Sequence, residues 1–192
     1  MKLKNEVIIA AVFLFLAVLF VFQFQPIITG HVVLDPNKVS LEDYPFPFVK
    51  NNFYNDVYIV LGRKHDSAET FAANDIAYGL KGLRGVLPPV VLETDVPANA
   101  HNLILVGTPC SNTMVANFLG SDDCSNFKDA GVVILDSKDR SASLLVSGRT
   151  SEDVRRAALF VRYIDLYAPL GNIAFVHGSI ENPNGLMVEY KN

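Results

Sequence analysis

The chain has 192 residues, of which 50% are hydrophobic and 19% are charged, and its formal net charge is −4 at pH 7. It carries 16 basic and 20 acidic side chains with no run of Lys or Arg, which argues against a nucleic-acid partner. Tryptophan and low-complexity tracts are absent, and the part after residue 30 is about the size of one domain.

Residues 7–24 form an uncharged apolar run in which Gln23 is the only polar side chain. As a helix the run would be about 27 Å long, close to the roughly 30 Å hydrocarbon core of a bilayer. Lys2 and Lys4 precede it, which predicts a cytoplasmic N-terminus and an extracellular C-terminal part. We therefore expect residues 1–26 to be a single-pass membrane anchor. A cleaved signal peptide is the alternative, although its apolar region is usually shorter.

Residues 27–54 contain several prolines, which disfavour regular structure on either side, and we interpret them as a tether. Within it, residues 44–48 read Tyr-Pro-Phe-Pro-Phe. These rings either pack on the following domain, which we favour, or form a peptide-like recognition segment. We expect the exported domain to span residues 55–192.

A unit of apolar strand, glycine, loop and helix occurs three times in this domain. The apolar runs are residues 57–61, 103–106 and 144–146. They are followed by Gly62, Gly107 and Gly148, respectively, and helical spacing then begins at Ser67, Asn112 and Thr150. Further strand candidates are residues 90–93, 132–135, 173–176 and 187–190. This alternation predicts an α/β domain whose sheet is largely parallel and covered by helices, preceded by the N-terminal transmembrane helix.

Cys110 and Cys124 are the only cysteines, and both lie in the part predicted to be extracellular, where thiols tend to be oxidised. A short helix and a turn between them can bring the two sulfurs together. Closing a loop of about 15 residues would stabilise the fold by roughly 3 kcal/mol in the chain-entropy description. The spacing favours a disulfide over two free, buried cysteines. A catalytic Cys110 is less favoured, because no motif pairs it with a histidine.

Two glycine-bearing loops combine basic side chains with a helix N-terminus, a setting suited to anions. The residues concerned are Gly62, Arg63, Lys64, Gly148 and Arg149. Parallel strands would bring both loops to one edge of the sheet. Neither loop matches a dinucleotide or P-loop pattern, so ordinary turn chemistry is the competing interpretation.

The sequence offers no motif for catalysis or for metal binding. The four histidines have no ligand spacing, and no nucleophile elbow, His-Glu-x-x-His or Cys-x-x-Cys pattern occurs. His65 and Asp66 could serve as a base and its orienting acid, but an exposed loop is the simpler interpretation. We therefore predict no catalytic residue, no metal and no cofactor.

Several segments resemble those of archaeal S-layer proteins. Four family patterns are similar to segments of this chain, in the family's order and spacing. NLILVGGPCAN is similar to residues 102–112, LLVAGYSAEDTRRAA to residues 144–158, AAADIA to residues 72–77 and DTEV to residues 93–96. Cys124 falls where the family places its second cysteine. The similar segments span residues 57–165, most of the predicted domain.

The resemblance implies a non-enzymatic protein of the archaeal cell envelope. It would act as a membrane-anchored module in envelope or surface-lattice assembly, with S-layer proteins, other envelope proteins or itself as partners. It transfers no catalytic residue. A binding module for surface polysaccharide or another anion, through the loops at Gly62 and Gly148, is the alternative. An exported hydrolase or transferase that uses His65 and Asp66 is a third hypothesis, which requires a histidine and a carboxylate to converge in a cleft.

Overall fold

The computed structural model describes residues 39–192 apart from 52, 127–129, 139–140, 183–184 and 192, all within the second of the chain's two units, residues 35–192. Its helices are α2 (Ser67–Arg84), α3 (Thr113–Leu119) and α4 (Ser151–Arg162). Three short 3-10 turns are η1 (Leu41–Asp43), η2 (Cys124–Asn126) and η3 (Ile164–Leu166). The strands are β1 (Val49–Lys50), β2 (Phe53–Tyr54), β3 (Val57–Leu61), β4 (Val90–Leu92), β5 (Asn102–Val106), β6 (Gly131–Lys138), β7 (Ser141–Gly148), β8 (Ile173–His177) and β9 (Met187–Lys191).

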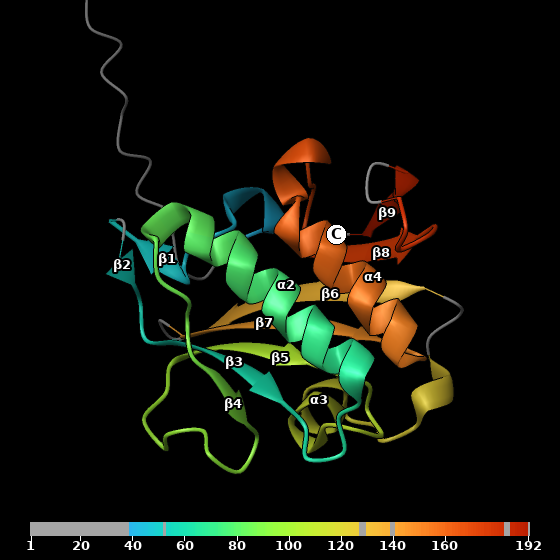
Figure 1. Cartoon of the computed structure of the whole chain (residues 1–192), viewed down its shortest axis with the longest axis horizontal. Helices are drawn as coiled ribbons and strands as arrows, with labels where there is room; N and C mark the ends of the chain where they lie inside the picture. The colour runs from blue at the N-terminus through green and yellow to red at the C-terminus, as the bar shows by residue number, and fades with distance from the viewer. Residues whose placement is uncertain (1–38, 52, 127–129, 139–140, 183–184, 192) are drawn as a thin grey trace, which may run out of the picture. The chain divides into compact units, whose positions relative to one another are not determined.

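Seven strands form the main sheet in the order β4-β3-β5-β7-β6-β8-β9, and β1 and β2 form a small antiparallel pair (Figure 1). The pairings among β4, β3, β5 and β7 are parallel. The pairings β7-β6, β6-β8 and β8-β9 are antiparallel. Only two residues separate β6 from β7, a length that suits a hairpin and is too short for a parallel crossover.

The predicted fold class is therefore wrong and is corrected to a mixed α/β sheet. Three strand pairings are parallel and three are antiparallel, so the sheet is not largely parallel. Among the residues that the structure describes, no helix has the length and apolar character needed to cross a membrane. The predicted transmembrane run, residues 7–24, lies outside the described residues.

Helices α2 and α4 lie side by side over one face of the sheet, which we call the front face (Figure 1). Buried alanines let both helices approach the strands and each other; they are Ala72, Ala73, Ala77, Ala157 and Ala158. At Gly131 of β6, an added Cβ would lie 2.5 Å from the backbone oxygen of Asp153 in α4. Small side chains at this contact therefore set how closely α4 packs on the sheet.

The opposite face of the sheet, the rear face, is covered less completely. The short helix α3 buries a small cluster there, made of Val60, Leu105, Val115, Val132 and Leu145. Other side chains that pack against this cluster are only partly buried; they include Tyr58, Leu103, Ile134 and Phe175. The expectation of a sheet covered by helices thus describes the front face better than the rear face.

The segment that precedes β3 contributes to the same core. Val39, Leu41 and Phe48 are buried with the front-face residues, and Tyr44 and Phe46 pack against them. The backbone N–H of Leu41 donates to the carbonyl of Gly171, 2.8 Å away. From Val39 onward, the residues predicted as a tether are therefore part of the packed domain.

Candidate functional site: a pocket at the strand ends

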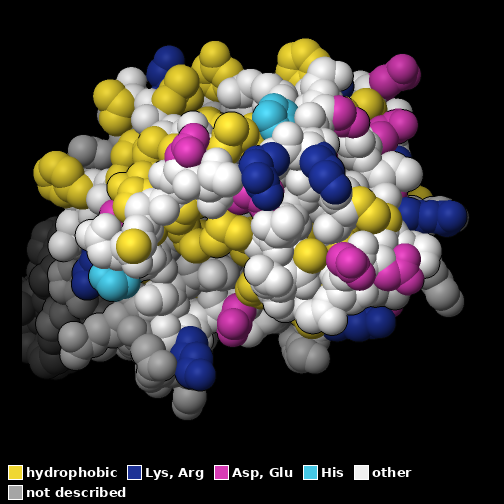
Figure 2. Space-filling view, turned by 90° about the horizontal axis from the view of Figure 1, so that it is seen from below, with side chains coloured by type: hydrophobic (Ala, Val, Ile, Leu, Met, Phe, Trp, Pro, Cys, Tyr) yellow, Lys and Arg dark blue, Asp and Glu magenta, His cyan; other side chains and the backbone are white. Residues whose placement is uncertain are grey.

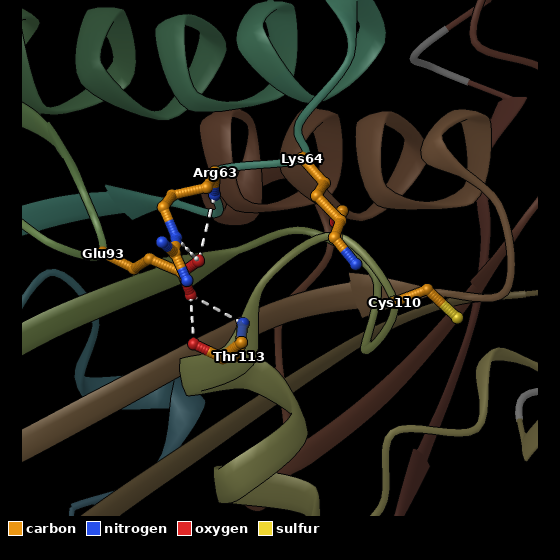
Figure 3. Close-up of a pocket in the computed structure, with 6 residues that line it drawn as sticks. Arg63, Lys64, Glu93, Cys110 and Thr113 are labelled. Atoms are coloured by element: carbon orange, nitrogen blue, oxygen red, sulfur yellow. Dashed lines mark hydrogen bonds and ion pairs between the residues drawn. The ribbon is translucent and has the colours of Figure 1, made fainter.

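The carboxyl ends of β3, β4 and β5 meet at one edge of the sheet, because these strands are parallel neighbours. The segments that follow them surround a pocket of about 400 Å³ (Figure 3). Its lining residues are Arg63, Lys64, Glu93, Cys110, Ser111 and Thr113. This is the place where open α/β sheets usually bind ligands, so it is the candidate site.

Glu93 organises one wall of the pocket, although its side chain is only 5% exposed. Its carboxylate accepts hydrogen bonds from the backbone N–H of Arg63 at 3.1 Å and of Thr113 at 2.7 Å, and from the Thr113 hydroxyl. Burial raises the pKa of Glu93, but these hydrogen bonds outweigh it and hold the pKa below its ordinary value. An ionised carboxylate of the chain itself therefore occupies the first turn of α3.

Side chains of the chain itself also accept hydrogen bonds from backbone N–H groups in the first turns of α2 and α4. At α2, Asp66 accepts from the N–H of Glu69 at 3.0 Å, and the Glu69 carboxylate accepts from the N–H of Asp66. At α4, Thr150 and Asp153 form a capping box. The helix N-termini that could have attracted an external anion are thus satisfied by the chain's own polar groups.

The two predicted ligand loops lie at the same edge of the sheet, where the Ser151 hydroxyl donates to Asp66, but they do not share the pocket. Arg63 and Lys64 line the pocket, whereas Gly148 and Arg149 do not. A Cβ on Gly62 would lie 2.0 Å from the carbonyl oxygen of Ser111, and a Cβ on Gly148 would lie 2.4 Å from the Cβ of Asp153. Both glycines are therefore required by close contacts between segments, as ordinary turn and packing chemistry demands.

Two cationic side chains remain at the pocket, in different settings. The Arg63 side chain is 66% exposed, and its Nε lies 3.5 Å from the Glu93 carboxylate. Lys64 extends across the pocket toward Cys110 (Figure 3), and among the described residues no carboxylate lies within ion-pair distance of it. On the face of the molecule seen in Figure 2, basic side chains are interspersed with acidic and hydrophobic ones. Lys64 is thus the cation most available to a bound anion.

Buried polar groups behind the pocket join its walls, and they are not among the site residues that the sequence predicts. Asn112 is fully buried, and its side-chain amide donates to the carbonyls of Val60 and Val106 at 3.2 and 3.0 Å. Its Oδ1 accepts from the N–H groups of Met114 and Val115, which caps α3. An asparagine directly before a helical pattern was the available signal for the cap. The contacts with two strand ends have no local signal.

Glu69 is the second buried group of this network, with 1% exposure. Its Oε1 accepts from the N–H of Thr108 at 2.9 Å and from the Ser111 hydroxyl at 2.5 Å. A glutamate three residues after Asp66 is the sequence signal of a capping box. The same carboxylate therefore caps α2 and fixes the loop after β5.

Cys110 and Cys124 form a disulfide, with their Cα atoms 5.8 Å apart. Cys110 is exposed at the pocket, while Cys124 begins η2 beyond α3. The bond therefore ties the loop after β5 to the segment that leaves α3, as the cysteine spacing predicts.

The histidine and acid proposed for hydrolysis turn to different partners. Nδ1 of His65 lies 2.7 Å from the carbonyl oxygen of Gly62. Asp66 accepts from the Ser151 hydroxyl, and this hydrogen bond is the main cause that lowers the pKa of Asp66. The two side chains do not converge in a cleft. Within the described ranges, no group of three or more His, Cys, Asp or Glu is placed to hold a metal ion.

No family model matches the chain, and no curated protein matches it. Among solved structures, it is similar to CpGH84D with a TM-score of 0.39 and 18% identity, over 62% of this chain and 19% of that chain. It is also similar to BtGH115A, a family GH115 4-O-methyl-alpha-glucuronidase with specificity for decorated arabinogalactans. That match has a TM-score of 0.40 and 15% identity, over 70% of this chain and 17% of that chain. The chain spans less than a fifth of either protein, and likenesses at these TM-scores carry no argument about its function.

Proposed function

We propose that this chain is an exported, non-enzymatic module that takes part in assembly of the cell envelope or of a surface lattice. The observation that carries the proposal is the disulfide between Cys110 and Cys124. Disulfides form and persist in oxidising compartments, outside the cytoplasm of most cells. An exposed bond at Cys110 is therefore consistent with work at the cell surface.

The residues behind the S-layer resemblance have structural roles in this fold. Asn102 begins β5; its amide donates to the carbonyl of Asn55, and its oxygen accepts from the N–H of Ala142 at 3.0 Å. Asn112 ends the same similar segment and joins β3, β5 and α3. A likeness carried by joints between strands and helices supports a shared scaffold better than a shared reaction.

The polar groups at the strand ends also favour a structural role. The carboxylates of Glu69, Glu93 and Asp153 are engaged by backbone N–H groups and neighbouring hydroxyls, so they hold segments together. Such a closed arrangement suits a rigid building block.

Crosslinking at the surface of intact cells that make the full chain tests the proposal. We expect envelope proteins or a second copy of the chain to be joined to it. Cys110 and Cys124 should react with a thiol reagent only after reduction of the disulfide, and a Cys110→Ser/Cys124→Ser variant is the control for labelling. Reduced, reactive cysteines in intact cells, or crosslinks to cytoplasmic proteins alone, would contradict the proposal.

Binding of an anionic surface polysaccharide is the second candidate, favoured by the position of Lys64 in the pocket. Arg63 and Lys64 line the pocket and Arg149 does not, so the basic side chains to test are Arg63 and Lys64. A Lys64→Ala change should weaken retention of the full chain on envelope glycan severalfold, whereas Lys50→Ala, at an exposed lysine of β1, should not. Equal retention of both variants would remove this candidate.

A further inference from the structure

The main sheet ends in two edge strands of different character. One edge is β4, which has three residues, with Pro88 and Pro89 before it and Pro97 after it. Short length and nearby prolines are common means by which proteins keep an edge from pairing with another chain. The other edge is β9, at the opposite end of the sheet (Figure 1).

Strand β9 has five residues, contains neither Pro nor Gly, and pairs with β8 from Met187 to Lys191. Among the described residues, no backbone hydrogen bond reaches its outer edge. Tyr190 fixes the strand from the front face, since its hydroxyl donates to the carbonyl of Tyr167 at 3.0 Å and its ring packs near Phe160. The outer edge is therefore a regular, well-supported template for another strand.

The charges of β9 lie on its exposed face. Met187, Glu189 and Lys191 are exposed and share the rear face, whereas Val188 and Tyr190 are partly buried. Glu189 has no cationic partner within ion-pair distance among the described residues. The ammonium of Lys191 lies 4.9 Å from the centre of the Phe175 ring. Both charges are thus available to an added strand.

We propose that β9 pairs antiparallel with β9 of a second copy, about a two-fold axis beside Tyr190. In this register Glu189 lies opposite the partner's Lys191, and Lys191 lies opposite the partner's Glu189. Directly opposed side chains of an antiparallel pair are close enough for opposite charges to attract. The inference rests on the proposed role in surface assembly and names the partner as the chain itself.

Charge complementarity selects this register over its neighbours. A two-fold axis beside Glu189 places two carboxylates directly opposite each other, which is destabilising. An axis beside Val188 pairs Met187 with the partner's Glu189 and leaves Lys191 without an opposed residue of β9. Only the axis beside Tyr190 forms two ion pairs, and it joins two seven-stranded sheets into one. The contact is closed by its symmetry, so a larger lattice needs a further contact.

Charge reversal provides a sharp test, with two differently tagged copies of the full chain made in the same cells and co-purified in mild detergent. In Glu189→Lys alone, lysines oppose lysines, and in Lys191→Glu alone, glutamates oppose glutamates. We expect recovery of the second tag to fall about tenfold in each case. A mixture of the two variants restores both ion pairs and should recover most of the wild-type signal.

Asp136→Lys is the matched control, because Asp136 is exposed on the rear face in β6, away from the edge. It should leave recovery unchanged. Rescue in the mixture also shows that each single variant is folded. Wild-type copies that do not co-purify, or variants whose mixture gives no rescue, would overturn the inference. Crosslinks between copies of the chain that persist undiminished in both single variants would overturn this interface and leave the proposed function standing.

Discussion

The parallel and antiparallel halves of the sheet are held together in different ways. In the parallel half, the segments after β3, β4 and β5 converge and are joined by Glu69, Glu93 and Asn112. In the antiparallel half, β6 and β7 follow one another directly, while α4 and η3 lie between β7 and β8 in the chain. Aromatic packing of Phe160 with Tyr190 supports the edge strand β9. The loops that the sequence suggests as ligand loops thus serve to hold neighbouring segments of the fold together. The edge best suited to pairing with a partner lies in the other half.

Gly62→Ala is the strongest test of these contacts between segments and should reduce the free energy of unfolding most. Its new Cβ would meet the backbone carbonyl of Ser111 at 2.0 Å, and backbone cannot move as a side-chain end can. We expect a loss of about 3 kcal/mol or more in the free energy of unfolding. The control is Gly120→Ala, where φ is +68° but no atom lies within 4 Å. It should lose about 1 kcal/mol. Equal losses in urea unfolding would show that the close approach is unimportant.

Asn112→Ala should have the next largest effect. It removes the cap of α3 and leaves the carbonyls of Val60 and Val106 without their buried donor. We expect a loss of about 2 kcal/mol, measured by urea unfolding at pH 7. Asp136→Ala, at an exposed position in the antiparallel half, should change the free energy by less than about 0.5 kcal/mol. If Asn112→Ala and Asp136→Ala have the same free energy of unfolding, buried polar contacts do not stabilise the parallel half as proposed.

Glu93→Gln should have a smaller effect that depends on pH. Because the pKa of Glu93 is lower in the folded state than its ordinary 4.5, its stabilising contribution is present above pH 4.5. That contribution is lost as the pH falls through the lower folded-state pKa. We expect the variant to be about 1 kcal/mol less stable at pH 7.

Unfolding of both proteins at a series of pH values checks this expectation. The gap between wild type and Glu93→Gln should narrow as the solution becomes acidic. Glu42→Gln, at an exposed glutamate of η1, should match the wild type throughout. A gap that does not change with pH would mean that the charge of Glu93 is not what stabilises the first turn of α3.

Local patterns in the sequence predict the elements of this fold better than their pairing. The runs ending at Gly62, Gly107 and Gly148 correspond to β3, β5 and β7, and each precedes a helix. The prediction of a largely parallel sheet was wrong because β6 and β7 pair antiparallel, and the two residues between them in the sequence, Asp139 and Arg140, lack the usual Asn-Gly or Asp-Gly hairpin signal. Strand pairing depends on contacts distant in the chain, and alternation with helices does not determine it.

Only part of the candidate site could be predicted, because the sequence reports local patterns and not contacts between distant segments. Gly62, Arg63 and Lys64 were recognised because a strand end and a helix start lie close in the sequence. The role of Glu93 depends on its contact with Thr113, which is created when β3 places β4 and β5 on its two sides. No periodicity or short motif reports such a contact.

Burial of Leu41 and Phe48 in the core has a mechanical consequence. A pulling force that is transmitted to Val39 acts directly on hydrophobic contacts inside the domain. Removing Leu41 from its place would also break its hydrogen bond to Gly171, just beyond the end of η3. Recombinant fragments that start at residue 55 would lack these side chains and expose the groove they fill, so an expression boundary belongs before Val39.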